Sequence, residues 1–152
     1  MIKMSSVLVA VDFGETSVNA LRYARDIARA FGAQLHVVHV TDVVSTTAAQ
    51  FYPDGPHDPE ARALALATSQ LRDLLAGSGC PALSIDVRVS PSVAQTIVER
   101  ARSIHADIII VGTHGRRGVS RLLLGSVAEH VVRHAPCPVL VVRGRDEEGT
   151  PA

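Results

Sequence analysis

Five short apolar segments recur along the chain and alternate with stretches whose apolar residues are three and four positions apart. Apolar runs rich in Val and Ile are typical of strands that are buried on both faces of a parallel sheet. The three- and four-residue spacing is typical of helices that pack one face against such a sheet. The pattern predicts strands over residues 6–12, 35–40, 83–89, 108–111 and 139–142, with a helix in each interval.

Glycine, proline and capping residues mark the expected ends of these helices. The four helices are predicted to run from residues 14–17 to Gly32, from Asp58-Pro59 to Gly77-Ser78-Gly79, from Ser90-Pro91 to Ile104, and from Ser126 to about His134. Residues 41–57 form the longest irregular stretch of the chain. Long loops in compact domains are often functional, so this segment is of interest for binding.

The alternation of strands and helices implies right-handed crossovers and an α/β domain built on a parallel sheet. Segment 83–89 alternates apolar and polar residues, which suits an edge strand with one face in water. We therefore expect a single-domain, open five-stranded parallel sheet in the order 3-2-1-4-5, with helices on both faces. Residues 1–144 should form this domain, and the polar residues 145–152 a flexible tail.

Length, composition and charge narrow the range of functions. The chain has 152 residues, of which 47% are hydrophobic, enough for one domain with a sizeable core. Fifteen basic and fifteen acidic residues cancel, so no overall field favours nucleic acid or a membrane surface. The apolar run Val7–Val11 is too short for a signal peptide or a membrane span. With only two cysteines, Cys80 and Cys137, the cytoplasm is the expected location.

Residues 107–127 combine a predicted strand, a glycine-bearing loop and the start of a helix. Gly112 ends the strand, Gly115 follows after two residues, and Gly125-Ser126 follows after nine more. Without a Cβ, Gly112 and Gly115 would allow phosphate or ribose to approach the backbone closely; the alternative is that they are only turn glycines. The loop matches neither the Gly-Lys-Ser/Thr end of a P-loop nor the Gly-x-Gly of a dinucleotide fingerprint.

The start of the last predicted helix offers main-chain donors to an anion. The N–H groups of Ser126 and Val127, together with the partial positive charge of a helix N-terminus, favour a bound phosphate. Segment 126–129 also matches a capping box, in which the Ser126 hydroxyl and the Glu129 carboxylate satisfy helix N–H groups. Both interpretations can hold together. Arg116 and Arg117 are either phosphate clamps or solvated loop residues.

Asp12 ends the first predicted strand as Gly112 ends the fourth, so the expected topology brings both residues to one crevice. The Asp12 carboxylate can accept hydrogen bonds from ribose hydroxyls, help to hold a metal, or serve as a cap or turn carboxylate for the first helix. His130 and His134 share a helix face, but no Glu follows His130 and no third ligand is evident, so a zincin site is not predicted. The loop contains no nucleophile elbow and no carboxylate pair, which favours binding over catalysis.

The glycine spacing resembles the ATP-binding signature of the universal stress protein family, Gly-x2-Gly-x9-Gly-Ser/Thr. The resemblance extends from Val7 to Val142 and is supported by residues 9–12, 39–42 and 136–142. It implies a domain of the adenine nucleotide alpha hydrolase-like type and a homodimer. It also implies that ATP is bound, with Mg or Mn held through the phosphates, and that the protein acts in stress responses.

The resemblance also implies roles for individual residues. Asp12 matches the aspartate that meets the nucleoside, and Ala10, Val11 and Val40 match residues that line the adenine pocket, partly by backbone. Val11 departs from the small or hydroxylated residue of many relatives, which would change the polarity of the pocket. His114 matches a position near the phosphates, although a loop histidine facing water fits as well. The expected nucleotide-binding residues are Ala10, Val11, Asp12, Val40, Val111, Gly112, His114, Gly115, Arg116, Arg117, Gly125, Ser126 and Val127.

The last strand predicts a contact between two chains. Its four residues carry no charge, and an exposed apolar edge of a sheet tends to pair with another strand. We expect a homodimer through Val139, Leu140, Val141 and Val142, as in the family. Three functions stay open at this point: a nucleotide-binding regulatory module, an enzyme with slow ATP hydrolysis or phosphoryl transfer, and a nucleotide-free dimeric scaffold.

Overall fold

The computed structural model describes residues 1–42, 58–79, 82, 84–114 and 124–144. These residues contain a five-stranded parallel sheet in the order β3-β2-β1-β4-β5, which confirms the predicted fold class and strand order. The strands are β1 (Ser6–Ala10), β2 (Gln34–Thr41), β3 (Ser84–Val89), β4 (Ile108–Gly112) and β5 (Val139–Val142). The helices are α1 (Glu15–Phe31), α2 (Pro59–Ser78), α3 (Val93–Ser103) and α4 (Ser126–His134).

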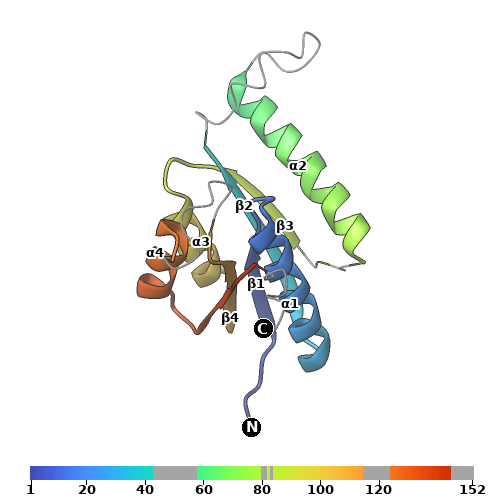
Figure 1. Cartoon of the computed structure of the whole chain (residues 1–152), viewed down its shortest axis with the longest axis vertical. Coiled ribbons are helices and arrows are strands. Elements are labelled where there is room, and N and C mark those ends of the chain that lie inside the picture. Colours follow the sequence, from blue (N-terminus) through green and yellow to red (C-terminus); the bar gives the residue numbers. More distant parts are fainter. Residues whose placement is uncertain (43–57, 80–81, 83, 115–123, 145–152) are drawn as a thin grey trace, which may run out of the picture.

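The helices cover the sheet in two pairs, α1 with α2 on one face and α3 with α4 on the other (Figure 1). Successive side chains of a strand point to opposite faces, so the apolar run of β1 supplies both cores. Val7 and Val9 pack in the core with α1 and α2, whereas Leu8 packs in the core with α3 and α4. The uninterrupted apolar character of the central strands therefore reflects burial on both sides.

The helix ends follow the predicted glycines with small shifts. α1 stops at Gly32, which has a φ of 64° in the left-handed region. α2 continues through Gly77 and stops at Gly79, the last residue of the predicted Gly77-Ser78-Gly79 ending, which has a φ of 61°. At Gly77 a Cβ would meet no atom within 4 Å, so the residue lies in an open position of a regular helix. α3 begins at Val93 because Ser92, not Ser90, is its N-cap residue.

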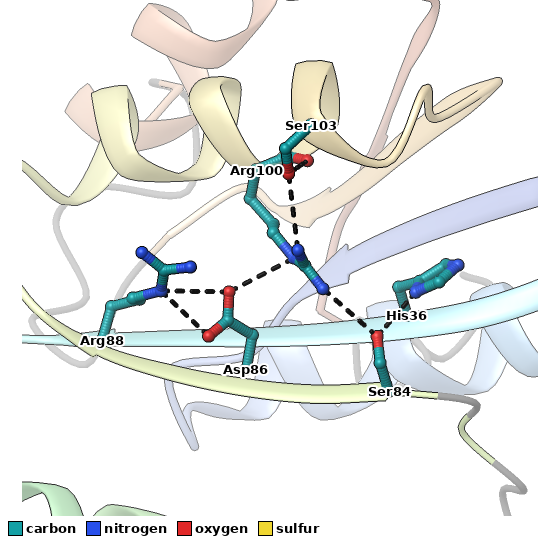
Figure 2. A network of polar contacts seen from close by, with 6 residues as sticks. All are labelled: His36, Ser84, Asp86, Arg88, Arg100 and Ser103. Atoms are coloured by element: carbon teal, nitrogen blue, oxygen red, sulfur yellow. Dashed lines mark hydrogen bonds and ion pairs between the residues drawn. The ribbon is translucent and has the colours of Figure 1, made fainter.

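β3 is an edge strand, as predicted, but α3 partly covers its polar face. Arg88 Nε donates to both Asp86 oxygens, at 2.9 and 3.1 Å, and Arg100 Nε of α3 lies 3.2 Å from Asp86 Oδ2 (Figure 2). Arg100 Nη2 also reaches Ser84 Oγ at 3.5 Å, and Ser84 Oγ lies 2.6 Å from His36 Nδ1. Burial, together with the nearby Arg100 charge, lowers the pKa of His36. The polar residues of β3 therefore do not only face water, because Ser84 and Asp86 also contact Arg100 of α3.

Parts of the prediction lie outside the described residues. Among them are residues 43–57 of the loop predicted over 41–57, the expected first residue of β3 (Leu83), residues 115–123, and the tail 145–152. Among the helices that the structure describes, none combines the length and the apolar character that crossing a membrane requires.

Candidate functional site

The chain turns away from β1 and β4 in opposite directions across the sheet. β1 leads through α1 to β2 on one side, and β4 leads to α4 and β5 on the other. In an open parallel sheet, this reversal leaves a crevice at the carboxyl ends of the two strands. Asp12 follows β1, Gly112 is the last residue of β4, and Val40 is the second-last residue of β2. The fold therefore brings these three predicted residues to the same end of the sheet, where β1, β2 and β4 terminate.

Asp12 opens a tight turn between β1 and α1. Its Oδ1 accepts a hydrogen bond from Gly14 N at 2.8 Å, and its own N–H donates to Ser17 Oγ at 3.1 Å. Ser17 Oγ in turn donates to Gly14 O at 3.0 Å. Phe13 has a φ of 66°, a left-handed conformation that is unusual for a large side chain. The interpretation of Asp12 as a turn carboxylate is confirmed. A carboxylate has several acceptor positions, so a contact with a ribose hydroxyl stays a prediction.

Gly112 marks the point at which α1 touches β4. A Cβ at this position would lie 2.5 Å from Thr16 Oγ1, 2.9 Å from the Thr16 carbonyl carbon and 3.0 Å from Ser17 N. Thr16 Oγ1 also donates to His114 O at 2.6 Å, which fastens the residues after β4 to the first turn of α1. Glycine is therefore needed here for packing within the protein, a reason that the sequence did not reveal. A ligand contact at Gly112 stays a prediction.

The start of α4 differs from the predicted capping box. Gly125 is the N-cap residue and makes no side-chain cap, and Ser126 is the first helical residue. The Glu129 carboxylate forms an ion pair with Arg133 at 2.9 Å and does not reach back to the helix start. Gly125 N donates to Thr113 O at 2.7 Å, and a Cβ on Gly125 would lie 2.7 Å from the same oxygen. The capping-box interpretation is wrong because this contact requires glycine at the N-cap, and glycine has no side chain to cap the amides of the first turn.

His114 follows the contact between β4 and α1. Its Nε2 is buried and has no hydrogen-bond partner in the described part of the chain. A buried polar atom without a partner costs roughly 1–3 kcal/mol, so a polar group of a ligand would be favourable at this position. The predicted residues Gly115, Arg116 and Arg117 come next in the chain, and they lie outside the described residues.

The side chains of the predicted adenine pocket take different positions. Val11 is 3% exposed and packs in the core with α1, while its N–H donates to Val38 O at 2.9 Å. Val111 is also buried, in the core beneath α3 and α4, and Ala10 packs against that core. Val127 lies in the first turn of α4 and is exposed. The structure therefore accounts for Val11 and Val111 as core residues, and any contact of theirs with a ligand stays a prediction.

Val40 differs, because its main chain faces the crevice. In a strand, the N–H and C=O of one residue point to one neighbouring strand, and those of the next residue point to the other. Val38 O accepts from Val11 N, and Thr41 O accepts from Ser90 N, so Val38 faces β1 and Thr41 faces the β3 side. Val40 therefore faces the β1 side, beyond the point where β1 has ended. Within the ranges that the structure describes, Val40 has no main-chain partner there.

His39 is a site residue that the sequence reasoning missed. Its Nδ1 lies 2.6 Å from Val11 O, and because a carbonyl oxygen only accepts, Nδ1 carries the proton. The side chain is buried, and its ring centroid lies 4.6 Å from that of Phe13, with the rings tilted by 45°. The available signal was the presence of a histidine within an otherwise apolar, buried strand.

A hollow lies along α1, and the described residues contain no metal cage. The hollow, of about 270 Å³, lies along α1 and is lined by Phe13, Glu15, Val18, Asn19 and Arg22, none of which was predicted to bind nucleotide. In the described ranges, no group of three or more His, Cys, Asp or Glu side chains is placed to hold a metal ion.

A doubly wound parallel sheet, with glycines at its switch point, defines a small α/β domain. The chain belongs to the universal stress protein family, whose model matches residues 4–143. A Staphylococcus epidermidis protein that carries the family name is 33% identical over 150 residues, covering 94% of this chain and 86% of that protein.

Solved structures of family members have the same fold. Universal stress protein UspA from Lactobacillus plantarum is 25% identical to this chain, with a TM-score of 0.74, and the match covers 94% of this chain and 100% of that one. A universal stress protein in complex with cAMP is 24% identical, with a TM-score of 0.64, over 94% of this chain and 99% of that one. At this level of identity, the match to the cAMP complex shows a shared fold only.

The close contact between Gly112 and α1 can be tested by substitution. We expect Gly112→Ala to lower the free energy of unfolding by about 2–3 kcal/mol, because the added methyl group meets main-chain atoms of α1 that have little room to move. Gly77→Ala is the matched control, since a methyl group there meets no atom within 4 Å. The control should be neutral or should stabilise the protein by about 0.5–1 kcal/mol. Urea unfolding measures both changes, and an undiminished stability of Gly112→Ala would contradict the described contact.

Proposed function

We propose that this chain is an ATP-binding regulatory module of the universal stress protein family. The observation that carries the proposal is the main chain of Val40, whose N–H and C=O face the end of β1 with no partner among the described residues. On its Watson–Crick edge, adenine presents an acceptor nitrogen beside an amino donor. One strand residue that offers an N–H and a C=O in the same direction complements that pair. The adenine would thus lie at Val40, with the ribose hydroxyls near Asp12.

The phosphates of this ligand would lie at the start of α4. Ser126 and Val127 are the first two helical residues, and the N-cap residue Gly125 provides no side-chain acceptor for their amides. Unpaired amides and the helix dipole together stabilise an anion at such a position. The buried Nε2 of His114 offers a further polar contact nearby in the chain. Gly115, Arg116 and Arg117 belong to the proposed phosphate site on the glycine signature alone.

Binding, and not turnover, is the function that the residues favour. Mg or Mn would be coordinated by phosphate oxygens, in keeping with the preference of these ions for oxygen ligands. The loop sequence offers no dedicated base to activate water, so occupancy of the site is the signal that the module would transmit. cAMP, found with one related structure, shares the adenosine part but lacks the triphosphate, so it serves as the competing ligand in binding measurements.

The proposed phosphate contact can be tested by removing one amide. Ser126→Pro deletes the N–H of the first helical residue, where proline is well tolerated, and the extended conformation of Gly125 (φ −62°, ψ 155°) suits a residue before proline. We expect ATP affinity, measured by calorimetry with magnesium, to fall roughly tenfold, as the loss of a hydrogen bond to a charged group predicts. Stability of the ligand-free protein should change little.

Ser126→Ala is the control, because it keeps the N–H and removes only the hydroxyl. We expect this variant to bind ATP as the wild type does. ATP at about a hundred times its dissociation constant should stabilise the wild type by roughly 2.7 kcal/mol. Absence of any such stabilisation by ATP, with cAMP equally inert, would refute nucleotide binding. Equal ATP affinities of Ser126→Pro and the wild type would refute the placement of the phosphates.

We also propose that two chains pair through β5. This strand lies at the edge of the sheet. Ile109 N donates to Pro138 O at 3.0 Å and Thr113 N donates to Val142 O at 2.9 Å, so alternate residues of the strand face β4. The main chains of Val139 and Val141 consequently face away from the sheet. An uncharged edge with outward-facing N–H and C=O groups is suited to pairing with the same edge of a second chain.

Val141→Pro tests this dimer with little effect on the fold. Proline removes an N–H that points away from β4, and edge positions of this kind are where sheets tolerate proline. We expect sedimentation at micromolar concentration to show a dimer for the wild type and a monomer for the variant. A monomeric wild type, or a variant that stays dimeric, would contradict pairing through this edge.

A further inference from the structure

We propose that His39 is a positioning residue of the nucleotide site, which holds β1 and β2 apart at their carboxyl ends and so keeps the main chain of Val40 open to the ligand. The inference rests on the proposed function and adds a side chain that the family signature does not contain. His39 itself would not touch the nucleotide. It acts through its hydrogen bond with Val11 O.

The hydrogen bonds between β1 and β2 show where the pairing of these two strands ends. Residue pairs run in register from Ser6 and Gln34 to Ala10 and Val38, and Val11 N then donates to Val38 O at 2.9 Å. The next bond of a regular parallel ladder would join Val40 N to Val11 O. This bond is not formed in the described structure, and His39 Nδ1 donates to Val11 O at 2.6 Å in its place. The imidazole thus takes over the acceptor that would otherwise bind Val40.

The histidine is held in this position from two directions. It is only 5% exposed, and its ring packs against the ring of Phe13 in the turn that follows β1. The peptide unit between Val11 and Asp12 is fixed at both ends, because Val11 O bonds to His39 and Asp12 N donates to Ser17 Oγ at 3.1 Å. His39 of β2 and Ser17 of α1 therefore fix the point at which β1 ends and the turn at Asp12 begins.

Two substitutions separate this role from simple core packing. His39→Phe keeps a ring beside Phe13 but removes the donor. His39→Asn loses the ring, but its side-chain amide can place an N–H close to the position of Nδ1. If the histidine only fills space, the phenylalanine should be the better replacement. If the donor holds the strands apart, the asparagine should be the better one.

Hydrogen exchange of the Val40 amide, followed by NMR in the ligand-free protein, tests the mechanism directly. We expect fast exchange in the wild type and in His39→Asn. In His39→Phe, exchange should slow by about tenfold or more, because Val40 N–H then pairs with Val11 O. His39→Leu gives the same test if the phenylalanine does not fold. A protected Val40 amide in the wild type, or unchanged exchange in the variants that lack the donor, would overturn the proposal.

Nucleotide preference provides the second measurement. In inosine triphosphate, the ring presents a donor and a carbonyl where adenine presents an acceptor and an amino group, so the Val40 main chain cannot satisfy it. We expect His39→Phe to lower ATP affinity about tenfold and to reduce the preference for ATP over inosine triphosphate, with both restored in His39→Asn. An unchanged preference in His39→Phe would overturn the proposal. If the wild type binds neither nucleotide, the proposed function fails, whereas the exchange data still decide whether His39 separates the strands.

Discussion

The hydrogen-bond ladder between β1 and β2 stops at the bond from Val11 N to Val38 O, and the candidate site depends on that stop. Up to this bond, β1 and β2 pair in register from Ser6 and Gln34 to Ala10 and Val38, inside a sheet that helices cover on both faces. Beyond it, β1 turns through Asp12 and Phe13 into α1, while β2 continues to Thr41. The difference in length leaves the main chain of Val40 without a partner on the β1 side among the described residues, and the proposed adenine contact lies there.

Close contacts between distant parts of the chain build the other side of the crevice. Thr16 of α1 donates to His114 O after β4, and Gly125 at the start of α4 donates to Thr113 O. Both contacts need a glycine, at position 112 in one case and at position 125 in the other, because a Cβ would lie within 3 Å of neighbouring main-chain atoms. The glycine signature therefore has a structural role in joining α1, β4 and α4. Because Gly125 is the N-cap residue of α4, no N-cap side chain accepts from the first amides of that helix.

The sequence was sufficient for the architecture because each strand and helix had its own local signal. Uninterrupted Val and Ile runs predicted β1 and β4, and the polar alternation of β3 placed it at the edge, so the strand order followed. The details of the site could not be predicted in the same way, because they depend on contacts between residues far apart in the chain. Ser126 and Glu129 have the letters of a capping box, but the N-cap residue is Gly125, whose N–H donates to Thr113 O. His39 likewise acquires its role only from the position of Val11 O.

The central claim is that the main chain of Val40 and the first turn of α4 bind one ligand at the same time. An NMR titration of the amide resonances with ATP and magnesium tests this most directly, since it reports both positions in one sample. The account predicts that the amides of Val40 and Ser126 shift together, with a single dissociation constant. Saturation with ATP that leaves the Val40 amide unmoved would contradict the account.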